Sequence, residues 1–414
     1  MDGRLRRATL AKARVNGVTT YLVESPEYFD GRGVYGDDGA DYADNAFRFA
    51  FFTRAVLAAS RALELDPDIY HVNDWQTALL PIYQGPDPAV PTVLTVHNLA
   101  YQGIFPSEWL PRLNLPPELF HIDGLEFYGR LSFLKGGLMA ADQLTTVSPG
   151  YAREIQTEEL GAGLEGVVRS RAERLTGILN GIEPRDWHPG KDEALVASYA
   201  STQLAGKLRG KHALQQELGL RASARTPLLA AIGRLDPQKG FDVLLEAAPA
   251  LLSSGRAQLV VLGSGNDALL DAFRRLEARF PEAVSANRGF QDALGRRIYA
   301  GADLFLMPSR YEPCGLGQMI ALRYGTLPVV RATGGLADTI RDLDADPDGG
   351  NGFSFDAYSA AALSAAVERA LRHYRDEKKW NRWVRRAMRQ DFSWKRSAAE
   401  YVRVYEKALR CSQM

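Results

Sequence analysis

Short runs of apolar residues alternate along this chain with longer stretches in which apolar residues recur at helical spacing. In the first half, we predict strands at residues 18–23, 68–72, 91–96, 143–147 and 175–179. Helices are predicted at residues 47–63, 77–83, 133–140 and 149–155. Strands that alternate with helices indicate a parallel sheet.

The same alternation resumes after a polar stretch that runs from Glu183 to about Thr226. Strands are predicted there at residues 228–232, 258–262, 304–307 and 327–330, and helices at residues 207–218, 242–252, 269–280, 316–325 and within 360–409. We therefore predict an α/β fold of two doubly wound Rossmann-like domains that face each other across a cleft. The predicted domains are residues 1–220 and 221–385, followed by a helical tail, 386–414, that packs back on the first domain.

Composition narrows the class of protein. The 414 residues contain 50 Lys and Arg against 50 Asp and Glu, so net charge gives no argument for nucleic acid or membranes as partners. Two cysteines indicate a reducing compartment and exclude a disulfide scaffold. We predict a cytoplasmic protein, or a plastid one if the source is a plant or alga, without predicting its oligomeric state.

The stretch from Asp303 to Gly325 carries the clearest candidate chemistry. An apolar strand breaks at Pro308 into a polar loop, and a helix follows, so the loop lies beside unpaired backbone N–H groups that suit an anion. Glu312 lies in this loop, where a carboxylate suits sugar hydroxyls or a developing positive charge. Cys314 lacks a nearby histidine base, so backbone contact is a better prediction for it than nucleophilic chemistry.

Other strand ends in the second half carry groups that suit phosphates. Arg234 and Lys239 follow a predicted strand in GRLDPQKG, where Arg binds in a bidentate manner and Lys acts as a point charge. The segment Thr333, Gly334 and Gly335 lets backbone N–H groups approach an anion. Each motif alone also fits solvated surface or turn formation.

Polar residues end the strands of the first half as well. Asp74 follows the strand at 68–72, His97 and Asn98 follow the strand at 91–96, and Asn180 follows the strand at 175–179. Because the carboxyl ends of parallel strands share one edge of a sheet, these residues are candidates for a ligand site. A lone histidine or aspartate is, however, more often structural.

Two further patterns suggest other chemistry. GSGNDA, from Gly263 to Ala268, matches a dinucleotide-binding pattern, but the acidic residue expected about 20 positions later is poorly placed. The alternating aspartates at residues 342–348 suggest a metal loop but lack calcium-loop spacing. We therefore predict no metal site and regard an NAD-dependent oxidoreductase as a minor alternative.

In order and spacing, four motifs resemble the bacterial glycogen synthase and plant starch synthase family. They are HNLAYQG at 97–103, GRLDPQKG at 233–240, SRYEPCGLGQ at 309–318 and RATGGLADT at 331–339. The resemblance extends from about residue 18 to residue 405. It implies the two-Rossmann (GT-B) fold and transfer of glucose from ADP-glucose to the non-reducing 4-hydroxyl of an α-1,4-glucan. It also implies retention of configuration, no metal and no other cofactor.

The resemblance assigns roles to the candidate residues. Arg234 and Lys239 match the diphosphate-binding pair, assisted by Thr333, Gly334, Gly335 and the backbone of Cys314, Gly315 and Leu316. Glu312 and His97 match groups that contact the donor glucose, and Phe290 falls where the family places an aromatic ring against adenine. The remaining substrate-binding candidates are Asp74, Asn98 and Asn180.

The chain departs from the family pattern at its start. A KTGGL-type loop that contacts the donor phosphates is expected before residue 18, and this segment is not present in the sequence. We therefore expect the first domain to be truncated at its N-terminus. The alternative function is a catalytically silent glucan- or nucleotide-sugar-binding remnant.

Overall fold

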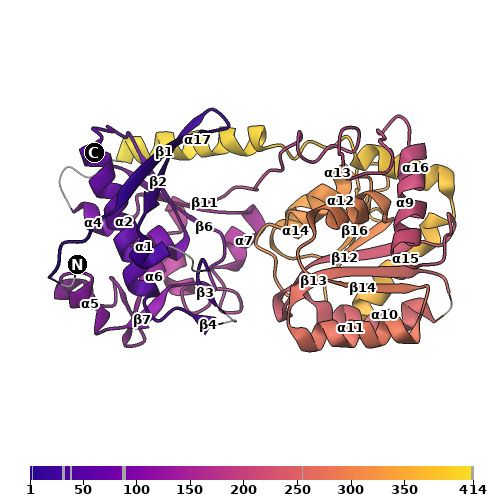
Figure 1. The fold of residues 1–414 in the computed structure, drawn as a ribbon, viewed down its shortest axis with the longest axis horizontal. Coiled ribbons are helices and arrows are strands. Elements are labelled where there is room, and N and C mark those ends of the chain that lie inside the picture. Colours follow the sequence, from indigo (N-terminus) through magenta and orange to yellow (C-terminus); the bar gives the residue numbers. More distant parts are fainter. Residues whose placement is uncertain (2, 30–32, 38–39, 86–89, 254, 412–414) are drawn as a thin grey trace. The chain divides into compact units, whose positions relative to one another are not determined.

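The computed structural model describes residues 1, 3–29, 33–37, 40–85, 90–253 and 255–411, and they form two compact units (Figure 1). The first unit comprises Met1–Val147, Ala152–Ile178 and Glu400–Met414, and the second comprises Ser148–Tyr151 and Leu179–Ala399. Among the described residues, no helix is both long enough and apolar enough to cross a membrane.

The first unit contains a parallel sheet with the strand order β11-β10-β6-β5. These strands are β5 (Tyr70–Asn73), β6 (Thr92–Val96), β10 (Gln143–Thr146) and β11 (Leu175–Gly177), which confirms four predicted strands. Its helices are α1 (Pro26–Phe29), α2 (Asn45–Ala62), α3 (Asp74–Thr77), α4 (Leu80–Gln84), α5 (Trp109–Arg112), α6 (Phe133–Ala140), α7 (Pro149–Glu154, shared with the second unit) and α8 (Glu165–Ser170).

The predicted strand at 18–23 exists but does not join this sheet. It is β2 (Val18–Glu24), and it pairs antiparallel with β1 (Thr9–Val15) in a separate hairpin. Asn16 and Gly17 both have positive φ, as a two-residue hairpin turn of the Asn-Gly type requires. Further short strands that were not predicted are β3 (Gly36–Asp37), β4 (Ala40–Asp41), β7 (Ile104–Pro106), β8 (Glu126–Phe127) and β9 (Arg130–Ser132).

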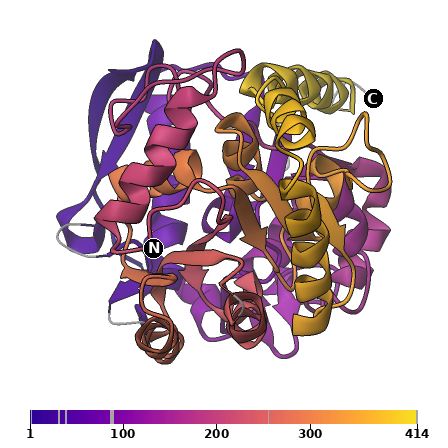
Figure 2. The ribbon, with the colours of Figure 1, turned by 90° about the vertical axis from the view of Figure 1, so that its right-hand side faces the viewer.

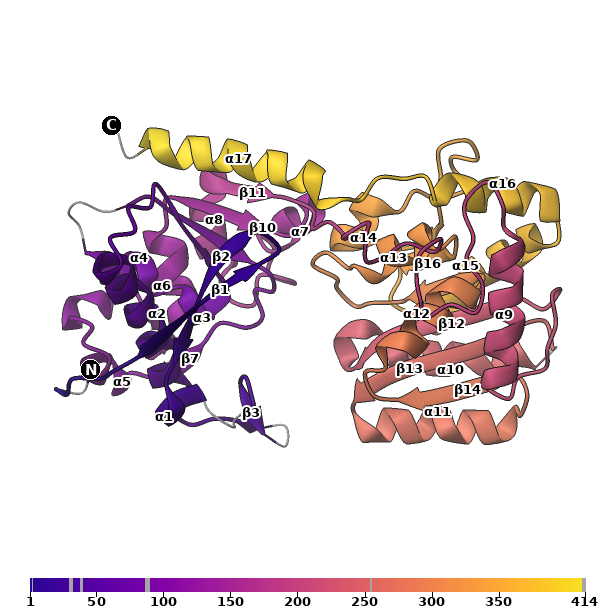
Figure 3. The ribbon, with the colours of Figure 1, turned by 45° about the horizontal axis from the view of Figure 1, so that its top comes forward.

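The end of the long C-terminal helix α17 (Trp394–Cys411) belongs to the first unit (Figure 3). Val404 and Ala408 pack in one buried cluster with Val93 of β6 and Ile178. The Tyr405 hydroxyl also lies 2.8 Å from Nδ1 of His71. This packing explains why the chain returns to its first unit after completing the second.

The second unit is built on a six-stranded parallel sheet with the order β14-β13-β12-β15-β16-β17. The strands are β12 (Leu228–Leu235), β13 (Gln258–Gly265), β14 (Val284–Arg288), β15 (Leu304–Met307), β16 (Leu327–Arg331) and β17 (Phe353–Phe355). The helices are α9 (Ala205–Glu217), α10 (Phe241–Leu252), α11 (Asp267–Arg279), α12 (Asp292–Gly301), α13 (Gly317–Arg323), α14 (Gly334–Thr339), α15 (Ala360–Tyr374) and α16 (Glu377–Ala387). Helix α9 packs on α12 and α10 packs on α15, so helices lie on both faces of the sheet (Figure 2).

The sequence analysis predicted neither a strand nor a helix between residues 280 and 304, whereas the structure has one of each there. The segment contains β14 and α12, which place one strand at the sheet edge and one helix against α9. Helix α12 carries two glycines and two arginines, and it is held in place by tertiary contacts of Leu294 and Ile298, which are buried. Tertiary packing therefore outweighs weak local propensity here.

The compact units divide at Leu179, earlier in the chain than the predicted boundary at residue 220. The polar stretch between them lies in the second unit because its side chains contact that unit. The Tyr199 hydroxyl donates a hydrogen bond to the carbonyl of Tyr324 (2.8 Å), and Lys207 of α9 reaches the same carbonyl.

Replacing Lys207 by methionine should destabilise the second unit. The buried Lys207 ammonium lies 2.8–3.1 Å from the carbonyls of Ala300, Ala302 and Tyr324 and the Thr326 hydroxyl. Methionine fills a similar volume but donates no hydrogen bond, so each of these buried oxygens loses one donor, which should lower the free energy of unfolding by about 3 kcal/mol. Urea denaturation measures this, with the exposed Lys191→Met as control. Equal stability of the two variants would contradict the prediction.

Candidate active site

The carboxyl ends of β12, β15 and β16 meet at one edge of the second unit because these strands are neighbours in the sheet. The loop after β12 carries Lys239, the loop after β15 carries Glu312, and Thr333 follows β16. The first two loops are joined by a hydrogen bond from the Arg310 N–H to the carbonyl of Gln238 (2.8 Å). The structure thus brings together the second-half motifs that the sequence left separate.

Lys239 and Glu312 form an ion pair at this edge. The Lys239 ammonium lies 2.9 Å from Oε1 and 2.7 Å from Oε2 of Glu312. The Glu312 side chain is only 5% exposed, whereas that of Lys239 is 24% exposed. The Ser309 hydroxyl donates a hydrogen bond to Oε2 of the same carboxylate (3.2 Å). The carboxylate is therefore fixed from two sides, and the lysine remains accessible to a ligand.

The short helix η3 (Pro237–Lys239) positions the lysine. The Asp236 carboxylate caps η3 by accepting a hydrogen bond from the Lys239 N–H (3.0 Å). Gly240 follows with φ of 72°, and a Cβ at this position would lie 2.0 Å from the Pro308 carbonyl oxygen. Glycine is therefore required where the β12 loop crosses the end of β15.

Arg234 and Phe290 lie at the ends of β12 and β14 with exposed side chains. The Arg234 guanidinium lies 3.4 Å from the Asp236 carboxylate and remains largely exposed. Phe290 is 94% exposed, in the loop between β14 and α12. Leaving an aromatic ring in water is unfavourable, so an exposed ring at a strand end suits a ligand with a flat face.

Helix α14 approaches the Glu312 loop closely. The Gly335 N–H donates to the carbonyls of Glu312 (3.1 Å) and Pro313 (3.2 Å). A Cβ on Gly335 would lie 2.1 Å from the Cys314 carbonyl oxygen, so only glycine permits this approach. The segment of Thr333, Gly334 and Gly335 is thereby held against the loop that contains Gly315 and Leu316.

Cys314 is buried, and burial raises the pKa of its thiol to about 12. The backbone N–H of Asn180 forms a hydrogen bond with this thiol and opposes the shift only in part. A protonated thiol is a poor nucleophile, in line with the predicted backbone role for this residue. Oδ1 of Asn180 is buried without a hydrogen-bond partner in the described structure.

Residues 148–151 were not predicted for the site, yet they contact it within the second unit. The Ser148 hydroxyl donates to the Pro313 carbonyl (2.6 Å), and the Gly150 N–H donates to the Asp338 carboxylate (2.6 Å). Both contacts join residues more than 160 positions apart, so no local sequence signal identifies them.

The first unit has its own polar cluster at the ends of β5 and β6. The Asp74 carboxylate accepts a hydrogen bond from the His97 N–H (2.7 Å) and another from the Asn98 N–H. Burial raises the pKa of Asp74, against these hydrogen bonds. Asp74 has φ of 55°, a conformation uncommon outside glycine that recurs at functional sites.

His97 is oriented by its neighbour in the same cluster. Its Nε2 lies 3.0 Å from the amide oxygen of Asn73, which only accepts hydrogen bonds, so Nε2 is the donor. In the neutral ring, Nδ1 is then a hydrogen-bond acceptor. Asp74 holds the backbone of His97, and Asn73 holds its ring.

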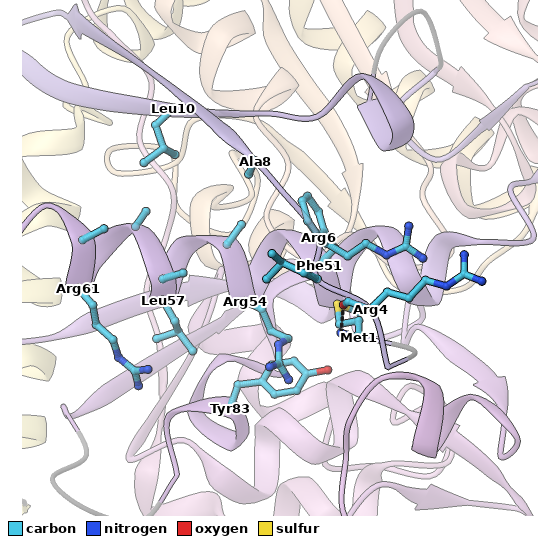
Figure 4. Close-up of a pocket in the computed structure, with 15 residues that line it drawn as sticks. Met1, Arg4, Arg6, Ala8, Leu10, Phe51, Arg54, Leu57, Arg61 and Tyr83 are labelled. Carbon is cyan, nitrogen blue, oxygen red and sulfur yellow. Dashed lines mark hydrogen bonds between the residues drawn. The ribbon is translucent and has the colours of Figure 1, made fainter.

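A separate pocket of about 500 Å³ lies between the N-terminal stretch and α2 (Figure 4). It is lined by apolar side chains such as Phe51 and Leu57 and by Arg4, Arg6, Arg54 and Arg61. The Arg54 guanidinium packs over the Tyr83 ring at 5.1 Å. None of the predicted site residues lines this pocket.

Two other sequence patterns have structural explanations. Gly263 and Gly265 of GSGNDA lie within β13, and Asn266 caps α11 by accepting a hydrogen bond from the Leu269 N–H (3.1 Å). Asp342 is paired with Arg369 at 3.0 Å, and the Asp344 carboxylate bonds both Arg369 (2.7 Å) and His373 (2.6 Å). The described residues contain no cluster of three or more His, Cys, Asp or Glu that could hold a metal ion.

Two parallel-sheet units with polar loops at the strand ends are the architecture of the GT-B glycosyltransferases, and two family models assign the chain to this class. The Starch synthase catalytic domain model matches residues 2–170, and the Glycosyl transferases group 1 model matches residues 219–390. The chain is 47% identical to the glycogen synthase of Syntrophotalea carbinolica, over 99% of this chain and 86% of the relative. It is 51% identical to the glycogen synthase of Anaeromyxobacter dehalogenans, over 93% of this chain and 82% of the relative.

A solved structure gives the same result. The catalytic domain of starch synthase IV from Arabidopsis thaliana, bound to ADP and acarbose, matches with a TM-score of 0.91 and 36% identity over 99% of this chain and 86% of that chain. The chain therefore belongs to the glycogen synthase and starch synthase family and is a hexosyltransferase. This membership overturns the oxidoreductase alternative, and the comparisons give no support to the expected N-terminal truncation.

Proposed function

We propose that the enzyme transfers glucose from ADP-glucose to the non-reducing 4-hydroxyl of an α-1,4-glucan, with retention of configuration. The observation that carries this proposal is the pairing of Lys239 with Glu312 at the carboxyl ends of β12 and β15. A cation for a departing diphosphate and a carboxylate for the glucosyl group are thus held side by side. Relatives named glycogen synthase and the ADP-bound starch synthase structure support this assignment.

The reaction breaks the bond between glucose C1 and the β-phosphate oxygen, and ADP leaves with the electron pair. The acceptor's 4-hydroxyl oxygen forms the new bond to C1, and its proton passes to the β-phosphate oxygen of the departing ADP. Arg234 and Lys239 stabilise the charge that develops on the departing diphosphate, and this stabilisation is often the largest catalytic contribution. Backbone N–H groups of Gly315 and Leu316 share that charge.

Glu312 balances the positive charge that develops at the glucosyl carbon as the bond breaks. In the unliganded state, that carboxylate neutralises Lys239. When the diphosphate binds, the Lys239 ammonium contacts both the diphosphate and the Glu312 carboxylate. The Ser309 hydroxyl, which donates a hydrogen bond to Glu312, keeps that carboxylate in position. In the first unit, we assign contacts with the substrates to His97, Asp74 and Asn98, and Asn180 supplies an acceptor from the second unit.

The proposed reaction is tested with radiolabelled ADP-glucose and a glycogen primer. We expect label in precipitable glucan, and much less label when UDP-glucose replaces ADP-glucose. Digestion of the product with an α-1,4-specific amylase should release the label and thereby check the linkage. ADP binding without incorporation of label would contradict the proposal and favour a silent binding protein.

Replacing Phe290 by alanine should weaken donor binding without affecting the fold. Stacking of an aromatic ring on a base contributes about 1–3 kcal/mol, so we expect KM for ADP-glucose to rise about tenfold at nearly constant kcat. The 94% exposure of Phe290 predicts an unchanged melting temperature. Tyr128→Ala, which removes another exposed ring, is the control. An unchanged KM would exclude contact between Phe290 and the donor.

We also propose a cytoplasmic location, which the low cysteine content of the chain supports.

A further inference from the structure

Gln318 is the last residue of the SRYEPCGLGQ motif, and the proposed chemistry gives it no role. It is the second residue of α13, and its side chain is fully buried at 0% exposure. Glutamine is seldom fully buried unless its amide is hydrogen-bonded. The contacts of this amide therefore indicate what the residue does.

The Gln318 amide joins two segments of the active-site edge. Its Nε2 lies 3.1 Å from the Cys314 carbonyl oxygen, 2.8 Å from the Gly315 carbonyl oxygen and 3.1 Å from the Thr339 hydroxyl. Thr339, on α14, donates its own hydroxyl proton to the Gly335 carbonyl (2.6 Å). One side chain thus connects the loop after β15 to the helix after β16.

These contacts fix the orientation of two peptide groups. In a planar trans peptide, the C=O and the following N–H point in opposite directions. Because the carbonyls of Cys314 and Gly315 face Gln318, the N–H groups of Gly315 and Leu316 face away from it. Neither N–H donates a hydrogen bond within the described part of the chain.

The Gln318 amide packs so closely against the loop that a side chain at position 315 would collide with it. Gly315 has φ of 71°, and a Cβ there would lie 2.5 Å from Oε1 of Gln318. Oε1 is itself buried without a hydrogen-bond partner among the described residues, which is unfavourable for stability. The reversed amide would place this oxygen against two carbonyl oxygens. The native orientation therefore keeps both carbonyls bonded at the expense of Oε1.

We propose that Gln318 is a positioning residue for the donor diphosphate. With Thr339, it locks the Cys314–Leu316 loop to α14 so that the N–H groups of Gly315 and Leu316 are presented to the phosphates. This inference rests on the proposed function, because the diphosphate is the ligand that those N–H groups bind. Gln318 itself touches no substrate.

A matched control separates this role from ordinary core packing. Gln215 on α9 is also fully buried, and its Nε2 donates to the Ser223 carbonyl (3.2 Å) and to Oε1 of Gln258 (2.7 Å). It contacts neither the loop after β15 nor α14 through any of these bonds. Gln318→Met and Gln215→Met each remove one buried amide of the same kind.

The experiment compares these variants by melting temperature, by ADP affinity from titration calorimetry, and by kcat and KM for ADP-glucose. Both variants should melt at lower temperature than the wild type. Only Gln318→Met should weaken ADP binding, by about tenfold or more, which corresponds to the loss of one or two hydrogen bonds. Gln215→Met should bind ADP with wild-type affinity.

Thr339 provides a conservative rescue. Thr339→Ser keeps the hydroxyl and should keep ADP affinity, whereas Thr339→Val should lose affinity in the same direction as Gln318→Met. The inference would be overturned if folded Gln318→Met kept wild-type ADP affinity and kcat. It would also be overturned if Gln215→Met lost as much ADP affinity as Gln318→Met. Neither result would contradict the proposed function. A wild-type enzyme that neither binds ADP nor transfers glucose would overturn the proposed function, and the inference with it.

Discussion

Replacing Lys239 by methionine should lower kcat for transfer from ADP-glucose by about 10³-fold, because one donor to the developing charge is lost. The lysine ammonium is the more accessible member of its ion pair with Glu312, so it is the group that can turn toward a diphosphate. Methionine keeps most of the length of the side chain but has no charge. A single-turnover assay at saturating donor measures the loss without the influence of binding.

The same substitution also affects stability, and the two effects must be separated. Without Lys239, the Glu312 carboxylate, 5% exposed, loses its cationic partner, which costs roughly 3–5 kcal/mol for a fully buried pair. The double variant Lys239→Met with Glu312→Gln removes this unpaired charge. We expect it to recover most of the melting temperature and none of the turnover.

A second buried pair in the same unit serves as the control. Lys211 and Asp303 pair at 2.7 Å, at the amino end of β15, away from the active-site edge. Lys211→Met should destabilise the unit to a similar degree, while folded enzyme keeps wild-type kcat. Turnover of Lys239→Met within a few-fold of the wild type would refute the assignment of this lysine to the diphosphate.

Most strands of both sheets and the polar residues at their ends could be predicted from sequence because buried strands have a strong local signal, whereas the edge strands β14 and β17 were missed. The period of the apolar residues identified β5, β6, β10, β12 and β15. The hairpin of β1 and β2 was missed although its Asn-Gly turn is a recognised signal.

Other features depend on contacts that a local pattern does not contain. The Lys239 to Glu312 pair spans 73 positions, and the Ser148 to Pro313 bond spans 165. Sequence reasoning therefore named Lys239 and Glu312 as separate candidates without predicting that they neutralise each other. The amide of Gln318 gave no signal either, because a glutamine in a helix is usually a surface residue.

His97 in the first unit should matter almost as much as Lys239. Replacing it by alanine should lower kcat/KM for ADP-glucose by about 10²-fold, as expected for the loss of one well-oriented hydrogen-bonding group. The orientation is already set in the unliganded protein by Asn73 at 3.0 Å and by the Asp74 carboxylate, which holds the backbone. The loss should therefore be in catalysis more than in folding.

His71 supplies the matched control for that prediction. It lies on β5 in the same unit, and its two ring nitrogens lie 2.8 Å from the Tyr405 hydroxyl and 2.6 Å from the Thr95 hydroxyl. Burial lowers the pKa of its imidazole, which disfavours the charged form. His71→Gln should lower the melting temperature and leave kcat/KM of folded enzyme unchanged. If His97→Ala instead lost stability like His71→Gln and kept its kcat/KM, His97 would be a structural residue and its assigned contact with the donor glucose would be wrong.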